Sequence, residues 1–178
     1  MSHIAKMNMI LAGDGHSNIF RQDSYQNPQR GKFDLIITNM PFGKRMKTEY
    51  ASLHGFNTNS AEVTGVLHCL DALSDYENSR AGIIAPEGIL FDSSKAYTQL
   101  RRELIEKYEI KTIISLPKKI FLPNTGVKSN VLIIKKQSRK NKHIWYFNVK
   151  NDGFTLDNAR NKIEGVNDFD NFLNEQSG

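Results

Sequence analysis

Short apolar runs alternate along this chain with segments of helical spacing. Continuous apolar residues predict buried strands over residues 33–38, 81–85 and 111–116. Apolar side chains three or four positions apart predict one helix over 63–73 and another after the capping run at 92–94. The alternation predicts an α/β fold class, with a mixed sheet that is mainly parallel and has an antiparallel end.

The N-terminal part carries weaker patterns. Residues 4–12 have helical spacing, and the turn Gly13-Asp14-Gly15 is expected to end that helix. Residues 19–23 predict a short strand that ends at Asp23. Residues 43–60 are polar, and we expect them to form a long loop that is a functional lid or partly disordered.

The C-terminal part is β-rich and then becomes polar. Segments 130–135 and 144–149 flank a charged turn over 137–143, so we expect them to form an antiparallel pair. After Lys150 the chain is rich in Asn, Asp and Gly. Five apolar residues of this part are expected to dock on the core: Phe154, Leu156, Phe169, Phe172 and Leu173.

Composition limits the class of protein. The 178 residues, 39% of them hydrophobic, are enough for one domain with a real core. The single cysteine, Cys69, excludes a disulfide framework within the chain and suits a reducing compartment. No apolar run approaches the roughly 20 residues that span a bilayer, and Met1 to Ile4 begin no signal peptide. We therefore expect a soluble, cytoplasmic protein.

One segment carries most of the chemical information. Residues Asp34 to Thr38 form an apolar strand that leads directly into the turn Asn39-Met40-Pro41-Phe42. In open α/β sheets, ligands bind at the carboxyl ends of strands. Asn39 offers an amide oxygen, Met40 a main-chain carbonyl and Phe42 a flat apolar face. Such a turn can hold a flat amine.

This turn resembles the Asn-Pro-Pro-(Tyr/Phe) signature of the amino-methyltransferases that modify the exocyclic amine of adenine in DNA. Further segments follow in the order and character of the modification (M) subunit of type I restriction-modification systems. They are Ala5–Leu11, Gly13–His16, Ile83–Phe91 and Ile120–Leu132. The resemblance covers most of the chain and implies a partial Rossmann-like, S-adenosylmethionine-dependent methyltransferase fold with DNA adenine-N6 methyltransferase activity.

The resemblance also implies an incomplete cofactor site. Members of the family carry a Gly-rich strand-to-helix turn and then an acidic residue, upstream of the segment similar to residues 5–11, and these hold most of S-adenosylmethionine. Neither is found in this sequence. We therefore expect residues 1–150 to be the C-terminal part of a catalytic domain, followed by a polar extension over 151–178. Asp23 matches the family carboxylate that binds the cofactor adenine, and an ordinary turn aspartate is the alternative.

The resemblance assigns Asn39, Met40, Pro41 and Phe42 to catalysis. The Asn39 amide oxygen and the Met40 carbonyl are expected to accept the two hydrogens of the adenine amine, which directs its lone pair toward the methyl donor. Met40 departs from the family pattern, which has proline at this position. Because the group used there is a main-chain carbonyl, we expect the turn to survive.

Two aromatic side chains are expected to bind the base once it has flipped out of the duplex. Phe42 would stack on one face, and Phe121 falls at the family position that packs on the other face. Simple core packing is the alternative for both residues.

The placement of positive charge says more than the formal net charge of +5. Basic residues follow the Asn39 turn at Lys44, Arg45 and Lys47, and precede Phe121 at Lys118 and Lys119. We expect these two groups to contact DNA phosphates, with solvated loop charge as the alternative. A third group, over 135–142, has the character of lysines that protect a strand edge, with phosphate contact as the alternative.

Other motifs carry less. His68-Cys69 has no partner at metal-ligand spacing, so we expect no metal site. The sequence Gly126-Val127-Lys128-Ser129 has some features of a phosphate loop, but the upstream glycine is missing, which favours a strand-entry turn.

Three functions remain open. The first is a DNA adenine-N6 methyltransferase with double-stranded DNA and the specificity and restriction subunits of a type I complex as partners. The second is an inactive fragment that serves as an interaction or remnant protein. The third keeps the chemistry and changes the acceptor to an RNA base or a protein glutamine amide.

The missing upstream part also predicts an exposed edge. In the family sheet, the strand that leads into the Gly-rich loop lies beside the strand of Asn39. Its loss leaves residues 33–38 as an uncovered apolar edge, which favours self-association or a rearranged N-terminal segment that covers it.

Overall fold

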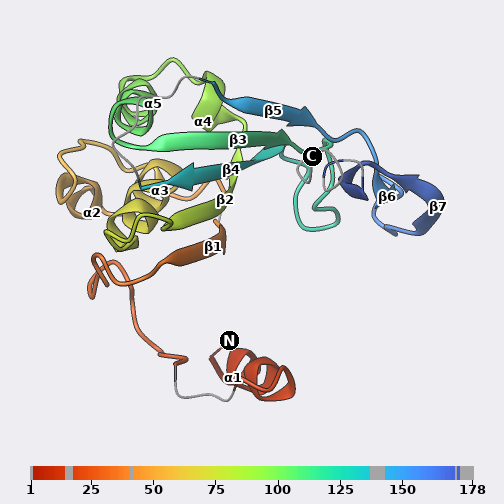
Figure 1. Ribbon diagram of the computed structural model, residues 1–178, viewed down its shortest axis with the longest axis horizontal. Coiled ribbons are helices and arrows are strands. Elements are labelled where there is room, and N and C mark those ends of the chain that lie inside the picture. Colours follow the sequence, from red (N-terminus) through yellow and green to blue (C-terminus); the bar gives the residue numbers. More distant parts are fainter. Residues whose placement is uncertain (1, 15–17, 41, 137–142, 171, 173–178) are drawn as a thin grey trace.

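The computed structural model describes residues 2–14, 18–40, 42–136, 143–170 and 172. A five-stranded sheet with the order β1-β2-β4-β3-β5 forms its centre (Figure 1). The strands are β1 (Leu35–Asn39), β2 (Arg80–Pro86), β3 (Glu109–Ser115), β4 (Ser129–Lys135) and β5 (Trp145–Asn148). Only β4 runs against the other strands of this sheet. The α/β class and the mixed, mainly parallel sheet are thus confirmed.

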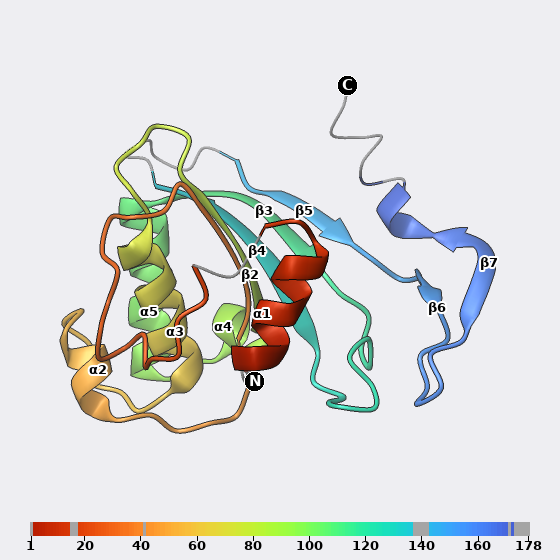
Figure 2. The same cartoon turned by 90° about the horizontal axis from the view of Figure 1, so that it is seen from below.

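The helices are α1 (Ser2–Leu11), α2 (Thr48–Ser52), α3 (Ala61–Ala72), α4 (Gly88–Phe91) and α5 (Lys95–Lys107). The expected helices at the N-terminus, after residue 60 and after residue 94 are confirmed as α1, α3 and α5. Figure 2 shows α3, α4 and α5 on one side of the sheet. Ser60 begins α3, where its hydroxyl accepts a hydrogen bond from the Val63 amide at 3.3 Å.

The main hydrophobic core lies between this helical layer and the sheet. Fully buried side chains come from α3, as with Val63 and Val66, and from the strands, as with Ile83 and Ile134. The period of two along β2 and β4 places one set of side chains under the helices. This packing fixes the position of the strands relative to the helices.

A smaller core lies on the other face of the sheet, around Ile114, Leu116 and Val149. Phe169 and Phe172 pack there, as expected. The ring centroid of Phe172 lies 5.1 Å from that of Trp145 and 5.3 Å from that of Phe147.

The expected docking of Phe154 and Leu156 on the core is wrong. Phe154 and Leu156 are exposed. Leu173 lies outside the described residues. This part of the chain instead forms a second, two-stranded sheet from β6 (Asp152–Phe154) and β7 (Lys162–Asn167).

Strand β1 is an edge strand and is not buried. Phe33, Leu35 and Ile37 are 45%, 52% and 81% exposed, because β1 pairs with β2 on one side only within the described chain. The expectation of an exposed apolar edge is confirmed, whereas the expectation of a buried strand is wrong. Helix α1 stands apart from the sheet in Figure 1 and has no buried residue. A rearranged N-terminal cover for the edge is therefore also wrong.

Segments 130–135 and 144–149 do not pair with each other, contrary to expectation. Strand β3 lies between β4 and β5, and β5 joins the sheet in parallel with β3 through residues Thr112 to Ser115. The two segments share the apolar pattern of a hairpin, but both edges of β4 are occupied by β2 and β3, so β5 adds to the free edge of β3. The turn over 137–142 lies outside the described residues.

Three local expectations on the N-terminal side have mixed outcomes. Residues 19–23 form no strand. Residues 43–60 are not a structureless loop, because they contain α2 and bury Ala51 and Phe56 in the core. The helix-ending turn after α1 is confirmed: Gly13 has φ +81° and the Asp14 amide donates to the Met9 carbonyl at 3.0 Å. Gly15 lies outside the described residues.

Among the described helices, none has the length and apolar character needed to cross a membrane.

Candidate functional site

A cavity of about 560 Å³ lies at the carboxyl end of β1. Its walls come from the turn after β1 and from the connection between β3 and β4. The lining residues are Asn39, Met40, Phe42, Lys44, Phe121, Asn124 and Thr125. The fold therefore joins two segments that are far apart in the sequence, and the cavity has the size of a small-ligand site.

Asn39 and Met40 point to different environments because they are successive residues at a strand end. Asn39, the last residue of β1, is exposed, whereas Met40 is 6% exposed and belongs to the main core. The Met40 amide continues the sheet by donating to the Ile84 carbonyl at 3.4 Å. The buried methionine side chain thus fixes the backbone directly after Asn39. Pro41 lies outside the described residues.

Phe42 and Phe121 meet at this cavity. Their ring centroids lie 6.5 Å apart, and the ring planes make an angle of 62°. This edge-to-face arrangement is a favourable aromatic contact. It is not a parallel slot, so one ring must rotate before both faces can stack on a single flat base.

Of the three expected basic residues, Lys44 lines the cavity, whereas Arg45 and Lys118 do not. Arg45 follows Lys44 directly and forms an isolated bridge with Ser60. Lys118 lies in the connection that carries Phe121 and is exposed. None of the three forms an ion pair with the described part of the chain.

Asp23 lies outside this cavity. Its carboxylate accepts hydrogen bonds from the Tyr25 amide at 2.9 Å and the Tyr50 hydroxyl at 3.2 Å. It ends no strand, contrary to expectation, since residues 19–23 are irregular. Its expected role toward a cofactor stays a prediction.

A second cavity, of about 330 Å³, runs along the side of β1 and shares Met40 with the first. Its lining is mostly apolar and includes Tyr25, Phe33, Ile36, His68 and Cys69. Burial lowers the pKa of His68, raises the pKa of Tyr25 and raises the pKa of the Cys69 thiol to about 11. These groups are therefore uncharged at neutral pH.

The described residues offer only part of a site for S-adenosylmethionine. The cavity beside β1 is lined by no aspartate, glutamate, lysine or arginine that could bind the charged amine and carboxylate of its methionine part. Asp23 and Asn39 do not line this cavity, although their sequence neighbours Ser24 and Met40 do. The fit to S-adenosylmethionine is therefore partial.

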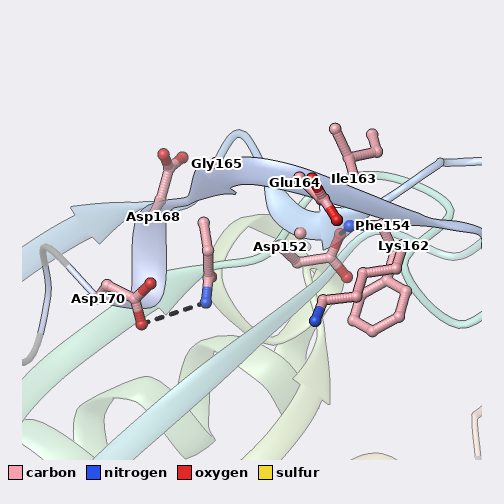
Figure 3. A pocket seen from close by; sticks show the side chains of 10 residues that line it. Asp152, Phe154, Lys162, Ile163, Glu164, Gly165, Asp168 and Asp170 are labelled. Atoms are coloured by element: carbon pink, nitrogen blue, oxygen red, sulfur yellow. Dashed lines mark hydrogen bonds between the residues drawn. The ribbon is translucent and has the colours of Figure 1, made fainter.

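A larger cavity, of about 850 Å³, lies between β6 and β7 and shares no lining residue with the Asn39 cavity. Figure 3 shows its acidic side chains, among them Asp152, Asp168 and Asp170. They already have partners: Asp152 pairs with Arg160, Asp168 accepts the Lys150 and Asn151 amides, and Asp170 accepts the Asn167 amide group. Within the described chain, no group of three or more His, Cys, Asp or Glu residues could hold a metal ion.

Comparison with known proteins places this arrangement in a family. The family model described as "N-6 DNA Methylase" matches residues 1–174. The chain belongs to the N-6 DNA methylase family. The resemblance of its motifs to the amino-methyltransferases of DNA is thereby confirmed.

Several curated relatives of the chain are methylase subunits of type I restriction enzymes, which confirms the resemblance of its motifs to type I modification subunits. The StySJI methylase subunit of Salmonella typhimurium is 32% identical over 112 residues, which are 63% of this chain and 20% of the relative. The EcoKI methylase subunit of Escherichia coli is 32% identical over 105 residues, which are 59% of this chain and 19% of the relative. The chain thus spans about a fifth of the length of these relatives.

Solved structures agree with the assignment of the chain to this family. The methyltransferase subunit of a type I restriction-modification system from Streptococcus thermophilus superposes with a TM-score of 0.79 at 25% identity, covering 99% of this chain and 40% of that one. A modification subunit of a putative type I restriction enzyme from Vibrio vulnificus gives 0.73 at 26% identity, with 96% and 37% covered.

The structure adds residues to the site that sequence reasoning missed. Asn124 and Thr125 line the Asn39 cavity, and they were contained in the segment 120–132 without being singled out. Glu62 is buried and accepts a hydrogen bond from the Gly43 amide, next to Phe42. A glutamate in the first turn of a helix is ordinary in sequence, so no sequence signal indicated this contact.

Proposed function

We propose that this chain is the adenine-presenting part of a DNA adenine-N6 methyltransferase, within the modification subunit of a type I restriction-modification system. The observation that carries the proposal is the cavity at the end of β1, where Asn39 and Met40 meet Phe42 and Phe121 in a member of the N-6 DNA methylase family.

The chemistry rests on two hydrogen-bond acceptors. The adenine amine is a poor nucleophile because its lone pair is delocalised into the ring. The Asn39 amide oxygen and the Met40 carbonyl each accept one amine hydrogen, which favours tetrahedral geometry and stabilises the positive charge that develops. Loss of one such preorganised group typically costs about 3 kcal/mol, or roughly a hundredfold in rate.

The base reaches these acceptors by flipping out of the duplex. An aromatic contact with the flipped base is worth about 1–3 kcal/mol, which helps to offset the lost pairing and stacking. From the observed edge-to-face geometry, we infer that Phe42 or Phe121 turns its ring when the base enters. The exposed Lys44, Arg45 and Lys118 bind phosphates of the flanking strand.

S-adenosylmethionine would supply the methyl group. Because the described residues fit only part of it, we expect the 178-residue polypeptide by itself to bind this cofactor more weakly than micromolar, that is, with less than about 8 kcal/mol of binding free energy. Calorimetric titration measures this directly, and micromolar affinity would contradict the expectation.

The partners follow from the relatives. Their names place them in type I restriction enzymes, so we propose double-stranded DNA and the specificity and restriction subunits as partners of this chain. We propose the cytoplasm as its location. The recognition sequence would then be read by the specificity subunit.

A second function has one specific observation in its favour. The exposed apolar edge of β1 suits a fragment whose role is to pair with another polypeptide rather than to catalyse. Methyl transfer by a complex that contains this chain separates the two functions. Activity on RNA or on a protein amide, without activity on DNA, would instead favour the acceptors of the third hypothesis.

The decisive experiment is Asn39→Ala in the complete methylase assembly. We expect methyl transfer to DNA to fall at least about a hundredfold, with DNA affinity little changed, because the amide acts mainly in the transition state. Asn148→Ala is a matched control, since Asn148 is also an exposed asparagine that ends a strand of the sheet. Equal losses of DNA binding and turnover would assign Asn39 a structural role.

A further inference from the structure

The turn after β1 rests on helix α3 at two points. The Gly43 amide donates a hydrogen bond to Glu62 Oε1 at 2.6 Å. Met40 packs so closely on α3 that a Cβ added to Gly65 would lie 2.5 Å from the Met40 Sδ. Glu62 and Gly65 are three residues apart and therefore share one face of the helix. The two contacts bracket Phe42.

Glu62 is buried to an unusual degree for a carboxylate, with 7% of its surface exposed. Its Oε2 accepts hydrogen bonds from the Ser60 hydroxyl at 2.8 Å and the Tyr97 hydroxyl at 3.4 Å. It forms no ion pair with any described lysine, arginine or histidine. Hydrogen bonds and the N-terminal end of α3 therefore compensate for its buried charge.

The stability of α3 alone does not explain this burial. Ser60 already caps the helix through the Val63 amide. An exposed glutamate in the first turn serves the helix dipole equally well, as Glu49 does in α2. What burial adds at Glu62 is the contact with Gly43, which comes from a different segment of the chain.

The contact fixes backbone geometry directly beside the proposed adenine-binding turn. Gly43 has φ +67°, a conformation that glycine adopts freely, so its position must be set by its neighbours. Glu62 orients the peptide between Phe42 and Gly43. The residues after Gly43 are held by main-chain hydrogen bonds: the Ala61 amide donates to the Lys44 carbonyl at 3.2 Å, and the Met46 amide donates to the Asn59 carbonyl at 2.8 Å.

We propose that Glu62 is a positioning residue for the proposed base-binding site: its buried carboxylate holds the Gly43 amide and, through it, the orientation in which Phe42 presents its ring to the base. The inference deepens the proposed function and rests on it for its catalytic consequence. The structural contact itself can be tested independently.

The first test measures backbone opening in this chain by amide hydrogen exchange followed by NMR. Glu62→Ala should accelerate exchange of the Gly43 amide by roughly ten- to a hundredfold beyond the change at the Ile84 amide, which reports on the central sheet. Glu62→Gln retains an acceptor oxygen and should keep most of the protection. Glu49→Ala, which removes an exposed first-turn glutamate, should change neither amide.

The second test measures steady-state methyl transfer in the complete assembly. Glu62→Ala should lower kcat by about tenfold or more while KM for DNA changes little, and Glu62→Gln should recover most of kcat, because the effect is on geometry rather than on DNA contacts. A wild-type assembly without methyl transfer would remove the proposed function, but the exchange measurement would still decide whether Glu62 holds the turn.

Equal acceleration at Gly43 and Ile84 in Glu62→Ala overturns the proposal, as does an unchanged kcat in that variant. If Glu62→Ala fails to fold, amide exchange in the wild-type protein and in Glu62→Gln tests the proposal instead. A Gly43 amide that exchanges as fast as an unprotected peptide would overturn the proposal, and a protected Gly43 amide that Glu62→Gln leaves protected would support it.

Discussion

The exposed edge of β1 predicts weak, concentration-dependent self-association of the 178-residue polypeptide. The exposed fractions of Phe33, Leu35 and Ile37 together correspond to fewer than two whole side chains. Full burial of one such side chain gains about 1.5–3 kcal/mol, so pairing two edges gains at most about 10 kcal/mol in both copies together. Each main-chain hydrogen bond across the paired edges contributes only about 1 kcal/mol net, and ordering the side chains at the edge costs about 0.5–1.5 kcal/mol each, so these two contributions offset one another.

Association also has a free-energy cost of at least about 4 kcal/mol. The remaining binding free energy is therefore no more than about 6 kcal/mol, which corresponds to a Kd of tens of micromolar or weaker. The edge is apolar enough to associate but too small to make a stable dimer by itself.

The perturbation is Ile37→Lys, at the most exposed of the three positions. The side chain is 81% exposed in the single chain, so the free energy of unfolding should change by less than about 0.5 kcal/mol. In a paired edge, the lysine would be desolvated, and association should weaken at least about tenfold. Ile163→Lys is the control, because Ile163 is an exposed apolar residue of the separate sheet of β6 and β7.

Sedimentation equilibrium from about 1 μM to about 1 mM covers the expected range of Kd. The reasoning is refuted by a strict monomer across this range together with fast amide exchange along residues 35–39, since neither self-association nor any other cover would then protect the edge. Equal association of wild type and Ile37→Lys would place the contact elsewhere.

Further outcomes are expected from single changes. Gly65→Ala should destabilise the fold, because the new methyl group would collide with Met40. This would reverse the usual effect, in which alanine in a helix gains about 1 kcal/mol over glycine. A higher urea midpoint in the variant would contradict the close approach of Met40 to α3. His68 should titrate below pH 6.5 by NMR, since burial lowers its pKa. The unfolded chain then binds the proton more readily than the folded chain, so the contribution of His68 to stability is complete above pH 6.5 and falls as the pH drops below that value. A titration at or above pH 6.5 would refute the reasoning. Lys44→Ala should lower the slope of log K against log salt for DNA binding by about 1, whereas Lys107→Ala, which removes a lysine paired with Glu103 on α5, should leave the slope unchanged.

Local chemistry let the sequence predict much of the fold. The apolar spacing of α3 and α5 and the glycine after α1 act over a few residues, and each of these elements lies where the pattern placed it. The capping run at 92–94 was placed correctly before α5, but Ser94 makes no side-chain hydrogen bond to the helix. The turn at Asn39 was equally local, because its strand, amide and aromatic ring are contiguous. The residues that surround this turn were known only from the structure.

Long-range contacts were decided by tertiary structure. The same apolar pattern fits a hairpin of β4 with β5, but both strands pair with β3, because the choice of partner depends on which edge remains free once the core has formed. Phe121 was assigned to the site by resemblance, whereas its edge-to-face angle with Phe42 follows from the packing of a distant connection. The role of Glu62 also depends on a long-range contact. Its sequence context is that of any glutamate in a first helical turn, and only the approach of the β1 turn to α3 gives its buried carboxylate an amide to bind.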